Sequence, residues 1–499
     1  MKLVNLSVKL GGFSAPMTTA TSRDFASLTT VQVAALTTSE LVQASSSQIQ
    51  SLSVGAVAVL SSVQVAALTS GQLNALTTAQ VGMLQSTQLQ AIDSSKIEQV
   101  DALIKKLGRT QITVLSTAQV QNLSGLEVKN LSVDQILGLI ADQLNAIGDD
   151  RFASFMTGQV AAFTTTQVSQ LSTGKIQALT STQIRAMETQ DVASLSSSAI
   201  KALTVANTTL LTAAQIKVLT TAVVAALRTE QIVALGVLGA TSLDTQQTAS
   251  LRGEQVAVLT TAQVGNFRLD QITAMTSAQV GNLSTASVAV LSVNQIKAIE
   301  TADFAALNTS AISALTTAQT VALTTDQVVA LTTAQAAKLS ADSAAVLSTS
   351  QATALQTADL ASLSTAAVNA LTTAAVSKLS TAQVSNLGTQ QIAALNLDQV
   401  AKLTTDQVVA LTTAQVAAIT SDQLAAMTTS QVAAMETRDV AALTTAQVSK
   451  LTEAQVAAMT TAQVKAIETA DLVKLTDAQL QVITTAAVSV MTSDQVSSL

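Results

Sequence analysis

The chain has 499 residues, with 24 basic and 31 acidic side chains, a net charge of −7, and no His, Cys, Trp or Tyr. The sparse positive charge argues against nucleic-acid binding, and the lack of cysteine excludes disulfides, zinc thiolates and thiol redox chemistry. No run reaches the roughly 18 apolar residues that a membrane helix needs. Acid–base catalysis would fall on scattered carboxylates, so we predict that the chain is not an enzyme.

Residues 1–19 lie outside the repeat that follows them. Val4, Leu6, Val8 and Leu10 alternate with polar residues, which predicts a short strand-like segment. Two roles fit this segment: a cap that covers the first repeat, or a strand offered to a neighbouring copy, which makes these four residues candidate assembly residues. Polar residues interrupt the apolar stretch, so it does not resemble a Sec signal, and we expect any export to use another route.

From residue 20 to residue 499 the chain repeats octapeptides such as LTTAQVAA, LTTDQVVA and MTTSQVAA. An apolar residue, the anchor, begins each octad, and every anchor from Leu115 to Leu499 is Leu, Ile, Met or Phe. The spacing of the anchors changes at one place: the stretch between the anchors Ile92 and Leu107 is one residue shorter than two octads. Over residues 93–108 we predict one longer amphipathic helix that stops at Gly108. The whole of 20–499 is otherwise predicted to be one continuous solenoid.

The octad, counted from the anchor as position 1, has the pattern of a helix start. A strand would put the apolar positions 1 and 6 on opposite faces, and a continuous helix would rotate the anchor by about 80° per octad. Threonine at position 2 with glutamine at position 5 is a capping box, and positions 1 and 6 form a hydrophobic staple. Since such short helices are unstable alone, we predict an all-α solenoid of one short helix per octad, with three or four helices per coil.

Four octads combine Glu at position 2 with Asp at position 5. Paired carboxylates favour a calcium site, whereas the alternative is a changed cap in which the following threonine caps the helix. The candidate calcium ligands are Glu188, Asp191, Glu300, Asp303, Glu436, Asp439, Glu468 and Asp471. Because neither a Gly-rich loop nor a third ligand accompanies these pairs, we expect caps and no cofactor. Arg228, Arg252 and Arg268, each two residues before an acid, are predicted to form surface ion pairs.

The octads resemble the Thr/Gln-rich octapeptide runs of very large predicted secreted or surface proteins of Gram-negative bacteria, over nearly the whole chain after residue 20. The resemblance implies an extracellular structural or adhesive role, and it carries no functional residue with it.

We therefore expect an extracellular or cell-surface structural protein: a rod that assembles with its own copies, head to tail, into a filament, stalk or surface layer. Leu499 is an anchor with no octad behind it, so we expect the apolar coil face there to contact another copy. The alternative is an adhesin-type or calcium-dependent scaffold that presents a surface to a glycan or to the cell surface.

Overall fold

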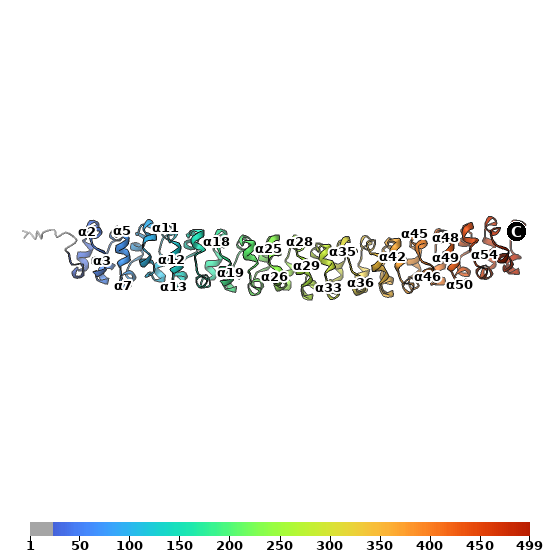
Figure 1. Cartoon of the computed structure of the whole chain (residues 1–499), viewed down its shortest axis with the longest axis horizontal. Coiled ribbons are helices and arrows are strands. Elements are labelled where there is room, and N and C mark those ends of the chain that lie inside the picture. Colours follow the sequence, from blue (N-terminus) through green and yellow to red (C-terminus); the bar gives the residue numbers. More distant parts are fainter. Residues whose placement is uncertain (1–22) are drawn as a thin grey trace, which may run out of the picture. The chain divides into compact units, whose positions relative to one another are not determined.

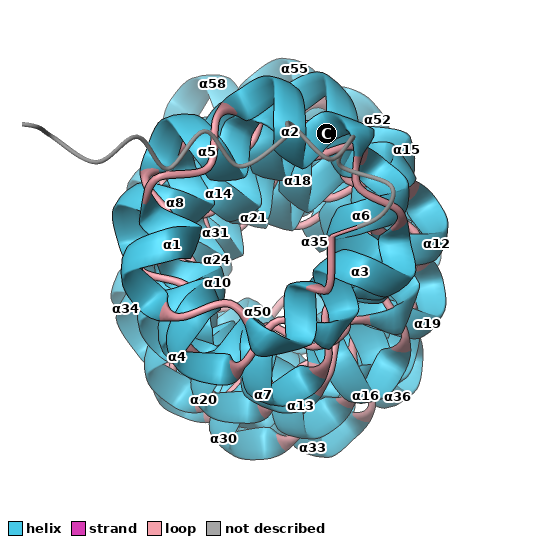
Figure 2. Ribbon diagram, turned by 90° about the vertical axis from the view of Figure 1, so that its left-hand side faces the viewer, coloured by secondary structure: helices cyan, strands magenta, loops and turns pink. Residues whose placement is uncertain are grey.

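A computed structural model describes residues 23–499, which form two compact units, one ending at Leu235 and the other spanning Gly236–Leu499. Each unit is an α-solenoid of short helices joined by tight turns, and residues 23–499 contain no strand (Figures 1 and 2). Unit 1 runs from α1 (Thr30–Ala34) to α25 (Thr229–Ala234), and unit 2 from α26 (Gly236–Ser242) to α58 (Ser493–Ser498). The strand-like segment predicted around Val4, Leu6, Val8 and Leu10 lies outside the described residues.

Most octads fold as one short capped helix, as the sequence predicts, and α48 (Thr413–Ala418) is representative. The Thr412 hydroxyl accepts from the Gln415 N–H at 3.3 Å, and the Thr412 N–H donates to Gln415 Oε1 at 2.8 Å, which completes the capping box. The next anchor, Ile419, leaves helical geometry at φ −57° and ψ 133°. The helix therefore stops because the chain must extend before the following cap can form.

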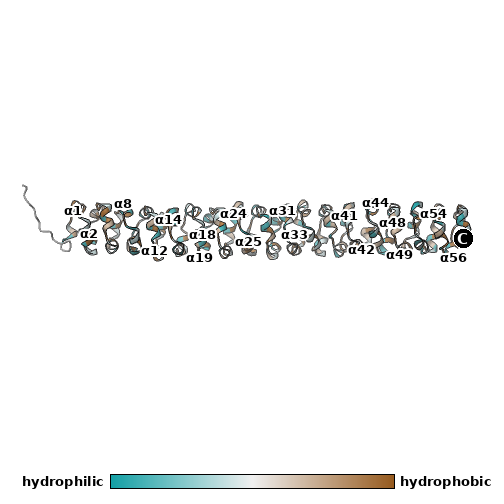
Figure 3. Cartoon of the chain, turned by 90° about the horizontal axis from the view of Figure 1, so that it is seen from above, coloured by the Kyte–Doolittle hydropathy of each residue, from teal (hydrophilic) through white to brown (hydrophobic). Residues whose placement is uncertain are grey.

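Positions 1 and 6 of the octads form the core, as the staple pattern predicts. Val416 and the anchor Ile419 are 0% and 4% exposed, and the same two positions are buried in almost every octad of both units. Figure 3 shows apolar and polar residues interspersed along the short helices, and burial places the apolar positions 1 and 6 in the core. Val, Ala and Leu suit this core because each helix contributes only about one turn and a half.

Each coil contains three helices, which settles the choice between three and four. Within both units a helix packs on the helix three places later, so that α45 (Thr389–Ala394) contacts α48, and α48 contacts α51 (Thr437–Val440). Residues three octads apart in the sequence therefore lie on neighbouring coils. Figure 1 shows these coils following one another within each unit.

The single longer helix predicted over residues 93–108 is wrong. The segment forms a 3-10 helix, η3 (Ser94–Gln99), and a short α-helix, α9 (Asp101–Ile104), separated by Val100 at φ −118° and ψ 37°. Gly108 does not stop a helix but occupies the N-cap position of α10 (Arg109–Thr113). Two lysines of this segment bond to the preceding coil: Lys96 Nζ donates to the Leu68 carbonyl at 2.9 Å, and Lys106 Nζ to the Leu76 carbonyl at 2.5 Å.

Unit 2 begins at Gly236, the one residue among 23–499 with a positive φ, at +62°. A Cβ added there would meet no atom within 4 Å, so only the backbone conformation restricts this position.

We predict that Gly236→Ala lowers the free energy of unfolding by about 1 kcal/mol, because an L-residue is strained in the left-handed region. Urea unfolding followed by circular dichroism measures the change. Gly158→Ala is the matched control, because Gly158 lies inside α16 (Thr157–Val160), also with open space at its Cβ. That variant should gain about 0.5–1 kcal/mol from helix propensity, so equal effects at the two glycines would contradict the argument.

Candidate functional site

The most regular polar feature of the chain is a row of buried glutamines at position 5, which we call the glutamine ladder. Gln415 illustrates it: besides its capping-box bond, its Nε2 donates to the Leu387 carbonyl at 2.7 Å and to the Val384 carbonyl at 3.0 Å, 28 and 31 residues earlier. The same bonds recur from Gln64 to Gln231 in unit 1 and from Gln271 to Gln495 in unit 2. Each glutamine thus joins the start of its own helix to the end of a helix in the preceding coil.

The chemistry of this position favours an amide. A capping box accepts either Glu or Gln, but Gln, unlike an ionised Glu, has both an acceptor for its own N-cap and donors for the carbonyls of the preceding coil. Nearly all of the ladder glutamines are almost completely buried, so an unpaired amide group there would be costly. The sequence does contain a sign of this second role, which the capping-box interpretation missed: Gln greatly outnumbers Glu at position 5.

The ladder glutamines still bond to anchor carbonyls across the irregular segment. Gln111 and Gln119 follow the one-residue deletion, and their Nε2 atoms donate to the Leu84 and Ile92 carbonyls, each 27 residues earlier. The corresponding offset in regular octads, as at Gln415, is 28 residues. Both partners are still anchors. The contact between coils, and not the residue count, therefore sets the register.

Five octads replace the ladder glutamine with Asp, and all five have a long side chain at position 2 in place of Ser or Thr. The pairs are Glu188 with Asp191, Glu300 with Asp303, Gln356 with Asp359, Glu436 with Asp439, and Glu468 with Asp471. The aspartate carboxylate usually accepts from a hydroxyl 26 residues earlier, as from Ser277 to Asp303 at 2.5 Å and from Thr413 to Asp439 at 2.7 Å. The octad has thus exchanged its short and long polar side chains while keeping a contact with the preceding coil.

The alternative prediction for these octads, in which the threonine after the glutamate caps the helix, is wrong. The threonine after the glutamate is the first helical residue and not the cap: α34 (Thr301–Phe304) begins at Thr301, and Glu300 holds the N-cap position without a side-chain capping bond. In each Glu–Asp pair the aspartate is buried, while the glutamate is exposed or partly exposed. The described residues contain no group of three or more acidic side chains arranged to hold a metal ion.

Two of the buried carboxyl groups at ladder positions have raised pKa values, and both keep oxygen atoms without a hydrogen-bond partner. These atoms are Oε1 of Glu127 and both carboxylate oxygens of Asp191. Burial raises the pKa of Glu127, and its hydrogen bonds with Ser124 only partly oppose that rise. Burial, together with the charge of Glu188, raises the pKa of Asp191 to about 6. Ionising either group inside the coil stack therefore costs stability.

Among the regular octads Lys175 replaces the ladder glutamine, and its charge is compensated in the preceding coil. Lys175 is 6% exposed, and its Nζ lies 2.5 Å from Oδ1 of Asp149, again 26 residues earlier. The same Nζ lies 5.8 Å from the centre of the Phe152 ring. The carboxylate and the aromatic face both stabilise the ammonium group.

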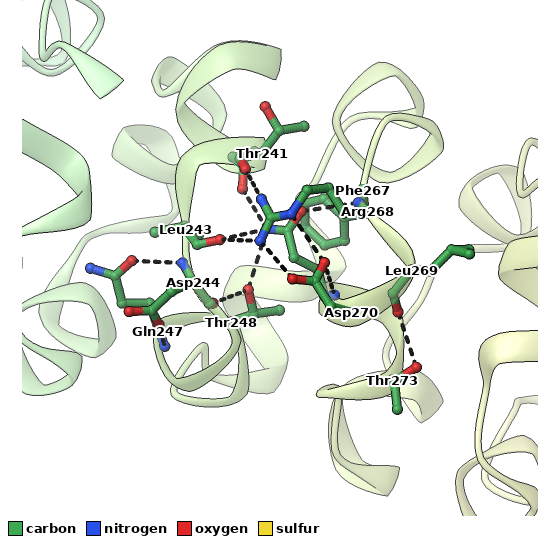
Figure 4. A network of polar contacts seen from close by, with 12 residues as sticks. Thr241, Leu243, Asp244, Gln247, Thr248, Phe267, Arg268, Leu269, Asp270 and Thr273 are labelled. Atoms are coloured by element: carbon green, nitrogen blue, oxygen red, sulfur yellow. Dashed lines mark hydrogen bonds and ion pairs between the residues drawn. The ribbon is translucent and has the colours of Figure 1, made fainter. Parts of the chain in front are cut away.

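The predicted surface ion pairs of the three arginines are confirmed. Arg228 and Arg252 lie 3.3 Å and 3.1 Å from the glutamates two residues later. In unit 2, Arg268 Nε lies 3.0 Å from Asp270 Oδ1, and its Nη2 also donates to the Leu243 carbonyl at 3.2 Å (Figure 4). Both charged side chains are about half exposed. The ion pair itself is therefore weak, and the bond to the anchor carbonyl adds to the contact between coils.

We predict that Gln415→Met destabilises the chain by about 2 kcal/mol, because it removes the capping acceptor and leaves two buried carbonyls unpaired without changing the side-chain volume much. Chemical unfolding monitored at several urea concentrations measures this loss. Gln32→Met in α1 is the control. Gln32 is exposed, and its Oε1 accepts from the N–H of the N-cap residue Thr29 at 2.9 Å. This variant should therefore lose only the capping energy, about 0.5 kcal/mol. A loss at Gln415 no greater than at Gln32 would refute the ladder's role.

None of the helices within residues 23–499 is long and apolar enough to cross a membrane. A search of curated proteins finds no match to the chain. The profile of the ALTTAQ repeat matches residues 45–78, 184–221 and 296–333, and then a series of overlapping segments from 352 to 499. These segments together cover just over half of the chain and coincide with regular capped octads. The chain belongs to the ALTTAQ repeat family.

Proposed function

We propose that this chain is a structural protein whose coils stack into a filament, stalk or surface layer outside the cell. The observation that carries the proposal is the identity of the coil-to-coil contact at successive steps, with a ladder glutamine on one side and anchor carbonyls on the other. A contact of this kind is heterologous and does not close on itself, so it extends a structure in one direction. The lack of cysteine and the resemblance to secreted and surface proteins support an extracellular location.

The last coil of unit 2 carries the surface that such growth would use. It consists of α56 (Asp477–Gln481), α57 (Thr485–Val488) and α58. Val488 and Val496 hold position 6 of their octads and are 47% and 54% exposed, whereas Val440 at the same position of an inner octad is 2% exposed. A further coil, from a second copy or from additional octads, would bury these side chains and bring new ladder glutamines to the carbonyls beneath them.

We predict that the purified chain forms filaments at micromolar concentration and that Val496→Asp prevents their growth, because a charge cannot be buried between two coils. Negative-stain electron microscopy and sedimentation measure both outcomes. Val409→Asp serves as the control, since Val409 is 41% exposed on an inner coil and should not affect growth. A wild-type chain that stays monomeric, or a Val496 variant that still elongates, would overturn the assembly proposal.

A second candidate function is a binding scaffold, favoured by a row of lysines in unit 2. Lys378, Lys402, Lys450 and Lys474 are exposed, and three or six octads separate each from the next. They follow α43 (Thr373–Val376), α46 (Leu397–Ala401), α52 (Thr445–Val448) and α55 (Thr469–Leu472), and together with α49 (Ser421–Ala426) these helices form one continuous stacked row. Acids such as Asp398 and Asp422 lie at the opposite ends of helices in this row. A lysine row of this kind suits an anionic polymer such as an acidic glycan.

We predict that replacing these four lysines by alanine weakens binding to a sulfated polysaccharide at least tenfold at low salt and removes most of its salt dependence. Surface plasmon resonance at several ionic strengths tests this. The matched control replaces Lys297, Lys338 and Lys465, three lysines of unit 2 that lie on other rows. Equal losses in the two variants would indicate general charge attraction, and absence of binding by the wild-type chain would eliminate this candidate.

A further inference from the structure

Glu127 is a buried glutamate at a ladder position. One of its two carboxyl oxygens, Oε2, makes the capping bond that the side-chain oxygen of a ladder glutamine makes. Its Oε2 accepts from the Ser124 N–H at 2.7 Å, and its own N–H donates to the Ser124 hydroxyl at 3.2 Å. The capping box of α12 (Gly125–Asn130) is therefore intact. The residue is 2% exposed, and its other oxygen, Oε1, has no partner.

The neighbouring members of the ladder show what normally stands in the place of Oε1. Gln119, one octad earlier, uses Nε2 to donate to the Ile92 carbonyl at 2.7 Å, and Gln135, two octads after Gln119, donates to the Leu107 carbonyl at 2.9 Å. Counted back by the same 27 or 28 residues, Glu127 corresponds to the backbone at residues 99–100, between η3 and α9. An amide N–H there meets carbonyl oxygens favourably, whereas an ionised carboxylate oxygen would be repelled by them and could not be solvated.

We infer that Glu127 is a proton-binding site: its carboxyl group holds a proton on Oε1 in the folded chain, and the resulting O–H replaces the missing amide donor to the preceding coil. Loss of this proton would leave an unsolvated charge at the junction between α12 and the η3–α9 coil. That junction is the place where the repeat has lost one residue, so the proton controls the contact at the least regular coil of unit 1.

The charges around Glu127 favour the protonated form. Asp101 and Glu98, both in the preceding coil, raise its pKa in addition to the larger effect of burial. Lys105 forms an ion pair with Asp101, with Nζ at 2.6 Å from Oδ2. Lys129 lies on α12 itself. On the other side, α15 (Asp149–Phe152) carries Asp149, Asp150 and Arg151, of which Asp149 pairs with Lys175 and Arg151 donates to the Gln121 carbonyl at 2.6 Å.

The sign of the pH dependence follows from the raised pKa. In the unfolded chain Glu127 ionises at its ordinary pKa, so the folded chain binds more protons between the two values. The stability of unit 1 is therefore highest below the ordinary pKa of a glutamate and falls as the pH rises through the raised pKa of the folded form. Asp191 has the same sign, with both oxygens unpartnered, so the chain should keep part of this pH dependence when Glu127 alone is replaced.

The test compares Glu127→Gln with the wild-type full-length chain in thermal melts from pH 4 to pH 8. Glutamine supplies the donor at every pH, so the variant should melt at the same temperature as wild type at pH 4 and several degrees higher at pH 8. Glu40→Gln is the matched control: Glu40 also completes a capping box at position 5, but it is partly exposed, and its bonds with Thr37 lower its pKa. This control should show no stabilisation that grows with pH.

A local readout separates the proton from a general packing effect. With glutamate labelled at its carboxyl carbon by ¹³C, the Glu127 resonance is identified by its absence from the Gln variant, and it should titrate at a higher pH than the other glutamates. Backbone amides of residues 94–104 should exchange faster with deuterium as the pH rises, beyond the intrinsic increase, in wild type and not in the variant. A Glu127 resonance that titrates with the exposed glutamates, or a melting difference independent of pH, would overturn the inference.

Discussion

The fold depends on a buried side-chain amide that bonds in two directions. Helices of four to seven residues have too few internal bonds to repay the cost of nucleation, and nearly all of their backbone groups are terminal ones. In Gln415 the carbonyl oxygen caps the start of α48, and the amide nitrogen donates to the Val384 and Leu387 carbonyls at the end of a helix in the preceding coil. One residue type thus satisfies both ends of successive helices, and this explains how a chain of single helical turns persists.

The apolar core and the glutamine ladder have separate tasks. Buried anchors and position-6 residues such as Val416 provide the nondirectional attraction between coils, and similar residues could pack in more than one way. The ladder adds direction, because a donor must lie within hydrogen-bond distance of one carbonyl of the preceding coil. The bond from Gln119 to the Ile92 carbonyl shows that the chain keeps this contact when the sequence between its partners is one residue shorter.

The sequence predicts the local structure well because capping is encoded within a single octad. Thr412 and Gln415 reveal the helix start, and Val416 and Ile419 reveal the core. The number of helices per coil depends on contacts between octads three places apart, about which the pattern of one octad says nothing. The error over residues 93–108 has the same origin: Lys106 lies where the last turn of a helix ending at Gly108 would be, but Lys96 and Lys106 both bond to carbonyls of the preceding coil. The Glu–Asp octads could be recognised as correlated, but their meaning required the hydroxyl partners in the preceding coil.

A uniform repeat has one weakness that its exceptions correct. If all octads were LTTAQVAA, any coil could stack on any other, and the chain could fold with a coil skipped or with a segment of another copy inserted. An octad whose ladder glutamine is replaced makes the stacking order less ambiguous, because its position-5 side chain needs a particular partner in the preceding coil. Lys175 needs the carboxylate of Asp149, and Asp303 needs the hydroxyl of Ser277. A skipped coil would separate the Lys175 ammonium from this carboxylate. The irregular octads therefore specify the order in which the regular ones stack.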